Sequence, residues 1–291
     1  MTLIASWVAT DDKPEGKKVS AVYFCADSRF TWSPTGMVYD MGKKVYSCKS
    51  YPEIFCFCGD VEFPTITIQS LVDEIDNEVL FDTNSSIDVK KSVITGFILQ
   101  SFQNYPKDVL AHTFSIYHAS CINQEFYITE YSYNGRSVEI SDHALPSKSQ
   151  VVFSAGSGKS LFDRMWLDAN KVDVNELNTS RNVYNCLSRT IDECKLHPDD
   201  KNLSMVGGCP QLVGLYRGGK TQIYGIIKDR ERYIHGRRVN YSPILNKIEW
   251  RNDNFERVNP ETMELLTGAQ AQPFAPRKKA IISPTSDVPM V

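Results

Sequence analysis

The sequence predicts an α+β protein in which sheets pack on each other and helices cover them from outside. Strand-like runs occur in three groups separated by two pairs of helix-like segments. That order does not fit the regular alternation of strands and helices in a parallel sheet. The chain has 291 residues, of which 42% are hydrophobic and 11% aromatic, so it can bury a sizeable core. Its length suits one large domain or about two average ones.

Local patterns place the elements of the first half. Strands over residues 3–9 and 19–25 flank a polar turn at 10–18, and strands over 44–48 and 53–58 meet near Pro52. Apolar residues at helical spacing then predict two helices. The first runs through Ile66, Leu71, Val72, Ile75 and Val79, and the second through Val89, Val93, Phe97, Ile98 and Phe102.

Strands return in the second half, over residues 112–119, 125–131, 137–140 and 150–155. Two more helices begin near Gly158 and Thr179, and Pro198 follows the end of the second. Arg217-Gly-Gly-Lys220 marks a hairpin between strands over 212–216 and 222–227. The composition changes near Asn246. We therefore expect one domain over residues 1–245 and a C-terminal extension over 246–291 that is partly disordered.

Charge and hydropathy narrow the class of protein. The 32 basic and 35 acidic side chains give a net charge of −3, which lacks the positive excess of a nucleic-acid-binding chain. No stretch reaches the ~20 apolar residues of a membrane-spanning helix, and the apolar start of the chain lacks the basic lead of a signal peptide. We expect a cytoplasmic protein with no nucleic-acid or membrane partner. The eight cysteines, dispersed through apolar runs, are expected to be reduced core thiols.

The start of the chain offers a candidate nucleophile. Thr2 follows Met1 directly and opens the first strand. Methionine aminopeptidase generally removes Met before a small residue, so the mature chain is expected to begin at Thr2. A terminal Thr carries a hydroxyl and a free α-amine whose pKa of ~7.7–8.0 suits it as the base for that hydroxyl. Many ordinary proteins also begin Met-Thr, so the dipeptide alone is a weak indication.

Four further motifs, through their order along the chain, support Thr2 as a nucleophile. Cys25-Ala-Asp-Ser-Arg-Phe-Thr31 ends the second strand, and Met41-Gly-Lys-Lys-Val45 opens the third. Phe55-Cys-Phe-Cys-Gly-Asp60 ends the fourth, and Ala155-Gly-Ser-Gly158 lies between a late strand and a helix. The series, over about residues 2–228, resembles the proteasome-like branch of the N-terminal nucleophile (Ntn) hydrolases. It is most similar to catalytic β-type subunits and to the bacterial heat-shock-locus peptidase. The resemblance implies a four-layer αββα sandwich.

The resemblance also implies a role for each matched residue. Thr2 would attack the scissile carbonyl and form an acyl-enzyme that water hydrolyses. Lys44 would lie beside Thr2 and lower the pKa of its hydroxyl and amine. Asp27 would hold Lys44 charged, and Ser157 would relay the proton of the amine.

The oxyanion position of the family falls on Cys58, next to Gly59, where a backbone N–H does the work. Peptide or protein substrates are implied, with no cofactor and no metal. The resemblance further implies a homo-oligomer, for example a ring, that an ATP-dependent unfoldase could feed. The chain itself contains no motif for such a partner.

Some positions depart from the family pattern. Many members carry Asp and Ser ahead of a late Gly-Gly pair, where this chain has Leu203 and Val206. Ser204, Asp199 or Asp200 could substitute only if the loop shifts. Two alternatives to a threonine peptidase therefore stay open. One is a non-catalytic proteasome-like scaffold or interaction subunit, and the other is a small-molecule amidase of the same fold.

Each candidate also has a purely structural interpretation. Lys44, with its neighbour Lys43, could form a solvated strand edge, Asp27 could cap a turn beside Arg29, and Ser157 could cap a helix. Other motifs are weaker still. Residues 156–160 lack the Gly at 153 that a phosphate-binding loop needs, and Cys56-x-Cys58 has no second pair to complete a metal site. The mixed charges of residues 228–238 favour a solvated surface or subunit contact over nucleic-acid binding.

Overall fold

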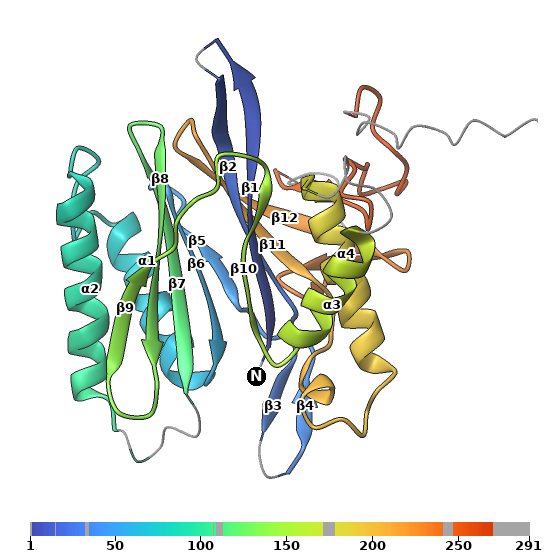
Figure 1. Cartoon of the computed structure of the whole chain (residues 1–291), viewed down its shortest axis with the longest axis horizontal. Coiled ribbons are helices and arrows are strands. Elements are labelled where there is room, and N and C mark those ends of the chain that lie inside the picture. Colours follow the sequence, from blue (N-terminus) through green and yellow to red (C-terminus); the bar gives the residue numbers. More distant parts are fainter. Residues whose placement is uncertain are drawn as a thin grey trace, which may run out of the picture.

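A computed structural model describes residues 2–14, 16–32, 35–106, 108, 113–170, 178–240 and 247–269. The chain is a mixed α/β structure whose strands are mostly antiparallel (Figure 1). The larger sheet has eight strands in the order β10-β1-β2-β11-β12-β13-β14, with β15 paired to β12. These strands are β1 (Leu3–Lys13), β2 (Gly16–Ala26), β10 (Gln150–Gly156), β11 (Gln211–Tyr216), β12 (Lys220–Lys228), β13 (Glu231–Ile234), β14 (Arg237–Arg238) and β15 (Glu249–Arg251).

The smaller sheet has five strands in the order β5-β6-β7-β8-β9, and a separate hairpin joins β3 to β4. Their bounds are β3 (Phe30–Trp32), β4 (Met37–Tyr39), β5 (Val45–Ser47), β6 (Glu53–Gly59), β7 (Phe114–Ile122), β8 (Glu125–Tyr133) and β9 (Val138–Asp142). The helices are α1 (Glu62–Asp76), α2 (Ile87–Asn104), α3 (Lys159–Asn170), α4 (Ser180–Lys195) and the 3-10 turn η2 (Leu203–Met205). None of these described helices is long and apolar enough to cross a membrane.

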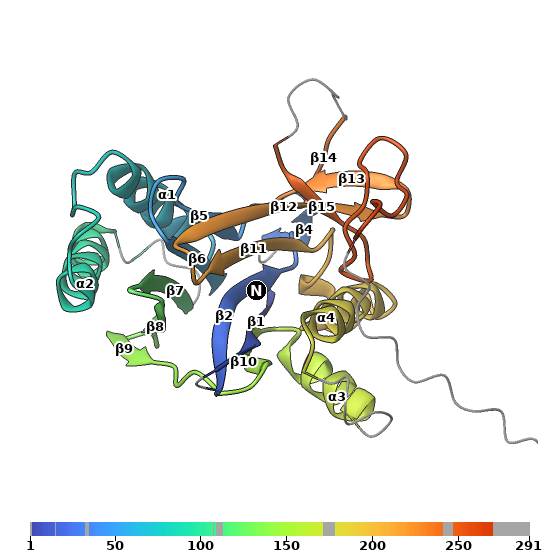
Figure 2. The same cartoon turned by 90° about the horizontal axis from the view of Figure 1, so that it is seen from above.

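The alternation of side chains along the strands divides most of the core into three clusters, and a fourth, smaller cluster joins Ile227, Trp250 and Val258. In β1, Leu3 and Trp7 pack toward α3 and α4, whereas Ile4 and Val8 pack toward the smaller sheet. Strand β6 divides its side chains in the same way between the larger sheet and helices α1 and α2. Successive residues of a strand point to opposite faces, so a strand buried on both sides must be apolar on both. Figures 1 and 2 show α1 and α2 beside the smaller sheet and α3 and α4 beside the larger one.

The first hairpin is longer than the sequence predicts. Residues 10–13 and 16–18, expected to form a polar turn, continue β1 and β2 as paired strand. Asp11 lies opposite Lys18 and Asp12 opposite Lys17 in the register. Opposite charges facing each other across two strands stabilise the pairing, which allows a polar segment to extend a hairpin.

Helices α1 and α2 lie where the apolar spacing predicts them, but their buried faces differ in part. Ile66 is 54% exposed, Val79 is 66% exposed and Val89 is 48% exposed. The buried stripe of α1 keeps the predicted Leu71 and Ile75 and adds Phe63 and Ile68, and Val79 lies beyond the end of α1 at Asp76. Both stripes satisfy the helical period, so only the contact with the smaller sheet selects between them.

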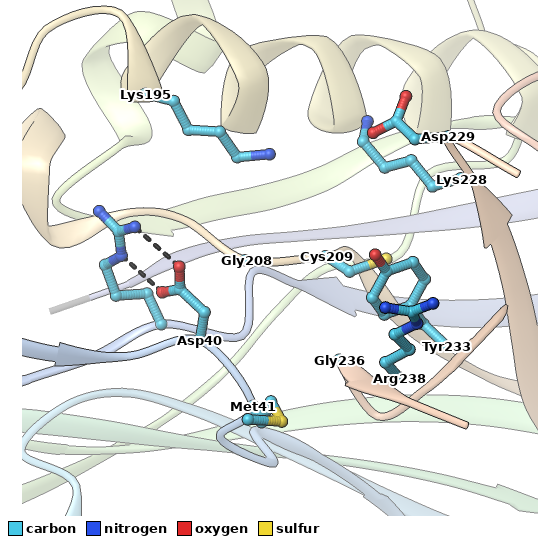
Figure 3. A pocket seen from close by; sticks show the side chains of 11 residues that line it. Asp40, Met41, Lys195, Gly208, Cys209, Lys228, Asp229, Tyr233, Gly236 and Arg238 are labelled. Carbon is cyan, nitrogen blue, oxygen red and sulfur yellow. Dashed lines mark hydrogen bonds and ion pairs between the residues drawn. The ribbon is translucent and has the colours of Figure 1, made fainter. Parts of the chain in front are cut away.

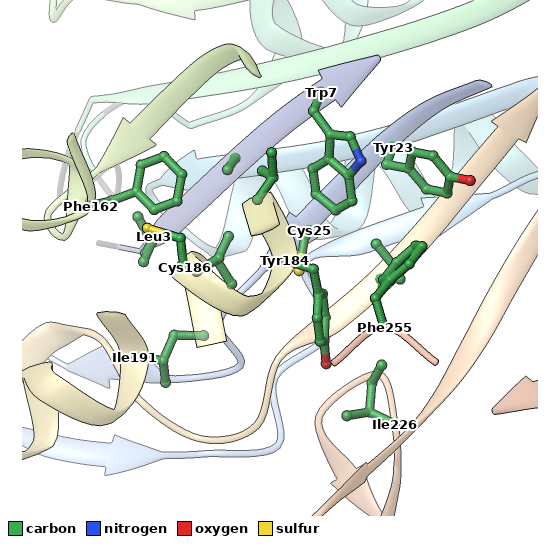
Figure 4. Close-up of a cluster of buried hydrophobic side chains, with 14 of the residues drawn as sticks. Leu3, Trp7, Tyr23, Cys25, Phe162, Tyr184, Cys186, Ile191, Ile226 and Phe255 are labelled. Carbon is green, nitrogen blue, oxygen red and sulfur yellow. The ribbon is translucent and has the colours of Figure 1, made fainter. Parts of the chain in front are cut away.

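The segment that follows Asn246 packs on the larger sheet through its described residues. Strand β15 pairs in parallel with β12. Phe255 is 3% exposed and its ring lies edge-on to Trp7 and Tyr23, at centroid distances of 6.3 and 5.8 Å (Figure 4). The change of composition at Asn246 therefore does not mark the end of the packed structure. Residues 270–291 of the extension expected to be partly disordered lie outside the described part, as does His112 of an expected strand.

We predict that Phe255→Ala destabilises the whole domain by about 3–5 kcal/mol, because it opens a cavity among Trp7, Tyr23 and Tyr184. Chemical denaturation followed by tryptophan fluorescence measures this free energy. Leu196→Ala, at a side chain that is 71% exposed, serves as the control and should change stability little. A Phe255→Ala cost as small as that of the control would show that this segment is not part of the core.

Candidate functional site

The carboxylate of Asp27 lies at the centre of the predicted site. Asp27 follows β2 and is fully buried. Its Oδ1 accepts from the backbone N–H of Leu3 at 2.9 Å and from Lys44 Nζ at 2.7 Å. Its Oδ2 accepts from the backbone N–H groups of Arg29 at 3.1 Å and Gly207 at 3.0 Å. Four donors satisfy this buried negative charge, as a carboxylate removed from water requires.

Lys44 is the buried cation of the site. Its side chain is 0% exposed, so it does not lie on a solvated strand edge. Burial lowers the pKa of its ammonium below the ordinary value, and the ion pair with Asp27 opposes that shift. The sequence-based pairing of Asp27 with Lys44 is thus present in the structure, and it bridges the end of β2 in one sheet and the start of β5 in the other.

Thr2 lies beside this ion pair. It is 1% exposed, and its carbonyl accepts from the N–H of Gly158 at 3.3 Å. A side chain at Gly156 would place its Cβ 2.1 Å from the same carbonyl oxygen, so this close approach requires glycine. The peptide N–H that follows Thr2 and the Lys44 ammonium both donate to Asp27 Oδ1. The structure therefore joins Asp27 to Lys44 and to the peptide that follows Thr2.

Arg29 and Ser28 hold the segment that contains Asp27 (residues 27–29) against the loop that contains Gly207 and Gly208 (the Gly-Gly loop). The Arg29 guanidinium pairs with both carboxylate oxygens of Asp40, at 2.7 and 2.8 Å. It also occupies the position that a Gly207 side chain would need, since a Cβ there would lie 2.4 Å from Arg29 Cζ. Ser28 Oγ accepts from the N–H of Cys209 at 3.0 Å. Sequence reasoning treated Arg29 only as a local partner of Asp27 and missed this contact.

Gln211 is a further residue that sequence reasoning missed. It is the first residue of β11 and is fully buried. Its amide bonds to the backbone of Asp27, Gly42 and Lys44, each at 2.9 Å. A glutamine at the start of an otherwise apolar strand, four residues after Gly207, is the pattern that could have indicated it.

The remaining predicted residues line a cavity of about 330 Å³. Cys58 and Gly59 come from the end of β6, and Ser157 follows β10. Burial raises the pKa of the Cys58 thiol, so the thiol stays protonated at neutral pH. The other described lining residues are uncharged: Thr113, Phe114, Ser115, Ser132, Tyr133 and Gly156. Thr2 is not among the described residues that line this cavity.

The proton relay expected of Ser157 has no acidic partner among the side-chain hydrogen bonds of the described residues. Its hydroxyl donates to Met205 Sδ at 3.9 Å, a weak acceptor. Val206 is fully buried in the apolar core. Asp200 accepts from the N–H groups of Asn202 and Leu203 and so caps the η2 turn. Of the candidate substitutes for the missing Asp and Ser, Asp200 therefore holds the loop itself.

A second cavity of about 290 Å³ borders the same loop (Figure 3). Asp40, Gly208 and Cys209 line it together with several basic side chains. Of these, Lys228 is buried and bonds to Asp192 Oδ2 at 2.6 Å, so this part of the mixed-charge stretch is not a solvated surface. The basic side chains Lys195 and Arg238 are also paired with carboxylates.

The turn between β13 and β14 packs against the Asp27 segment. Gly236 has a positive φ of 76°, and a Cβ on it would lie 2.1 Å from Ser28 Cβ. The neighbouring His235 has a buried Nδ1 without a hydrogen-bond partner in the described structure. Burial, with Lys43 nearby, lowers the pKa of His235 from 6.5 to about 4.

No protein-family model matches this chain, and no curated protein matches it. Among solved structures it is similar to Anbu (ancestral beta-subunit) from Yersinia bercovieri, at 16% sequence identity and a TM-score of 0.47. The match covers 73% of this chain and 81% of that one. A likeness of this extent says nothing about activity, so the function has to be inferred from the chain's own residues.

We predict that Asp27→Asn destabilises the protein by about 3–5 kcal/mol, because it leaves the Lys44 ammonium buried without its counter-charge. Urea denaturation measures the change. The matched control is Glu231→Gln, which removes a carboxylate from an exposed pair with Arg238 and should cost about 1 kcal/mol or less. Equal costs for the two variants would contradict the importance of the buried pair.

We also predict a loss of stability in mild acid that depends on His235. The folded-state pKa of about 4 lies below the unfolded value of 6.5, so the unfolded chain binds the proton more tightly. Stability from this group is complete above pH 6.5 and falls as the pH drops toward 4, by roughly 3 kcal/mol at most. In His235→Gln, the unfolding free energy should depend less steeply on pH across that range. His197→Gln, at an exposed histidine, should keep the wild-type slope.

Proposed function

We propose that the chain is an N-terminal threonine hydrolase of the proteasome-like type, which cleaves peptide bonds through an acyl-enzyme on Thr2. The observation that carries the proposal is the convergence on one buried oxygen, Asp27 Oδ1, of the Lys44 ammonium and the peptide N–H next to Thr2. The three core clusters separated by two sheets support the four-layer αββα arrangement that goes with this function. The proposal requires that the mature chain begins at Thr2.

The chemistry follows from the charges. The free α-amine of Thr2 accepts the proton of the Thr2 hydroxyl as Oγ1 bonds to the substrate carbonyl carbon. The C–N bond then breaks, the proton passes to the leaving amine, and water hydrolyses the ester. In this proposal the positive charge of Lys44 favours loss of a proton from the amine and the hydroxyl, and Asp27 opposes the lowering of the Lys44 pKa by burial.

The cavity beside Gly156 is the proposed place for the substrate. It has room for a side chain, and its lining includes the Cys58–Gly59 peptide that the oxyanion role requires. The described lining carries no charged side chain, which favours neutral groups over charged ones. A panel of peptides and small acyl amides would separate a peptidase from a small-molecule amidase. Assembly into a homo-oligomer, fed by an unfoldase, stays a prediction that size-exclusion measurements test first.

A second candidate is a non-catalytic scaffold of the same fold. It is favoured by Leu203 and Val206, which stand where the family pattern has Asp and Ser, and by the contact of the Ser157 hydroxyl with Met205 Sδ. In that case the Asp27–Lys44 pair serves only to join the two sheets. An intact-mass measurement discriminates, because a retained or acetylated Met1 would block the amine chemistry.

We predict that Thr2→Ala lowers acylation by threonine-reactive electrophiles at least ~10³-fold, since it removes the nucleophile. Mass spectrometry of the labelled N-terminal peptide measures the adduct, and circular dichroism checks the fold. Thr2→Ser, which keeps a hydroxyl on a small first residue, is the matched control and should still be labelled. Labelling of Thr2→Ala at the wild-type rate would remove the assignment.

A further inference from the structure

The side chain of Gln211 joins the two segments that carry the buried ion pair. Its Nε2 donates to the carbonyl oxygens of Asp27 and Gly42, both at 2.9 Å. Its Oε1 accepts from the backbone N–H of Lys44, also at 2.9 Å. Two carbonyls and one N–H surround the amide, so the reversed orientation would set oxygen against oxygen. Both N–H groups of the Gln211 amide and its oxygen therefore have a hydrogen-bond partner.

The position of Gln211 in the fold gives these bonds their importance. Gln211 lies opposite Ala26 in the larger sheet, one residue from Asp27. Lys44 precedes β5, which belongs to the smaller sheet. The amide thus reaches from one sheet to the other at the point where the ion pair also crosses. A backbone bond from Gly42 N to Ser28 O, at 2.8 Å, runs alongside.

We infer that Gln211 is a positioning residue for Lys44. The lysine side chain is long and has four rotatable bonds, so the ion pair alone fixes its ammonium but not its main chain. Gln211 fixes the main chain on either side of it, at Gly42 and at the Lys44 N–H. Together the two constraints set the distance between the ammonium and Thr2. The consequence for catalysis rests on the proposed function, whereas the consequence for Lys44 does not.

The variant that tests this is Gln211→Met, which keeps the length of the side chain and removes its hydrogen bonds. Two carbonyls and one N–H then lose their buried partners, so the segment at Gly42 to Lys44 is expected to move. Thr129→Val is the matched control. It removes a hydrogen bond of a fully buried side chain, to Asp142 at 2.7 Å, at a position in β8 that is not among the described residues lining the cavity of Cys58 and Ser157.

The first measurement is the acetylation of lysines by acetic anhydride, read by mass spectrometry in the mature protein. Lys44 and Lys90 are both buried, and Lys90 pairs with Glu53 on the other side of the smaller sheet. In Gln211→Met we expect Lys44 to be modified at least ~10-fold faster while Lys90 stays protected. Faster modification of both lysines would indicate general loosening and overturn the inference. Unchanged protection of Lys44 would overturn it as well.

The second measurement is the rate of Thr2 acylation against pH. Misplacement of the ammonium by about 1 Å can cost ~10²-fold in rate, so we expect Gln211→Met to be slower by that order. Its pH profile should shift to higher pH, because the amine of Thr2 loses a nearby positive charge. Thr129→Val should keep the wild-type rate and profile. If the wild type is not acylated but Lys44 still loses protection in Gln211→Met, the proposed function fails and the positioning role stands.

If Gln211→Met does not fold, Gln211→Asn is measured in its place. Gln211→Asn keeps the amide on a side chain that is shorter by one methylene. It should lose Lys44 protection in the same direction as Gln211→Met. Full protection of Lys44 in a folded Gln211→Asn protein, with a wild-type acylation profile, would contradict the positioning role.

Discussion

The placement of one carboxylate, that of Asp27, constrains much of the structure around it. It is removed from water and carries its charge only because four donors converge on it from separate parts of the chain. Three are the backbone N–H groups of Leu3, Arg29 and Gly207. Their bonds fix the start of β1, the residues that follow β2 and the Gly-Gly loop. The fourth is Lys44. Each donor therefore depends on the others, since losing one leaves part of a buried charge uncompensated.

Glycine at two positions makes this convergence geometrically feasible. Gly207 donates to Asp27 while the Arg29 guanidinium occupies its missing side-chain position. Gly156 allows the strand end to approach the carbonyl of Thr2. In both places the backbone has to come closer to a neighbour than a Cβ atom permits. The residues around the site are thus constrained by how closely two backbone segments must approach each other, as well as by charge.

A second buried ionic cluster shows that ion burial alone does not indicate a site. Glu53 accepts from Lys90, His118 and Ser120 between the smaller sheet and α2, and all four side chains are buried. None of its members is among the described residues that line the cavity of Cys58 and Ser157. What distinguishes the Asp27 pair is its bond to the peptide N–H that follows Thr2, whose carbonyl approaches Gly156 in the lining of that cavity.

The sequence by itself determined the order of the longer strands and of the helices, because apolar spacing and turn residues act over a few neighbours. It did not indicate the short strands β3, β4, β13, β14 and β15. The pairing of Asp27 with Lys44 was implied by the resemblance that the motif order carries, and the structure contains it. Tertiary structure alone decided which stripe of α1 is buried, since two stripes satisfy the same period. It decided that Phe255 enters the core and that Gln211 bridges the sheets. These outcomes depend on contacts between residues far apart in the chain, and no local pattern carries that information.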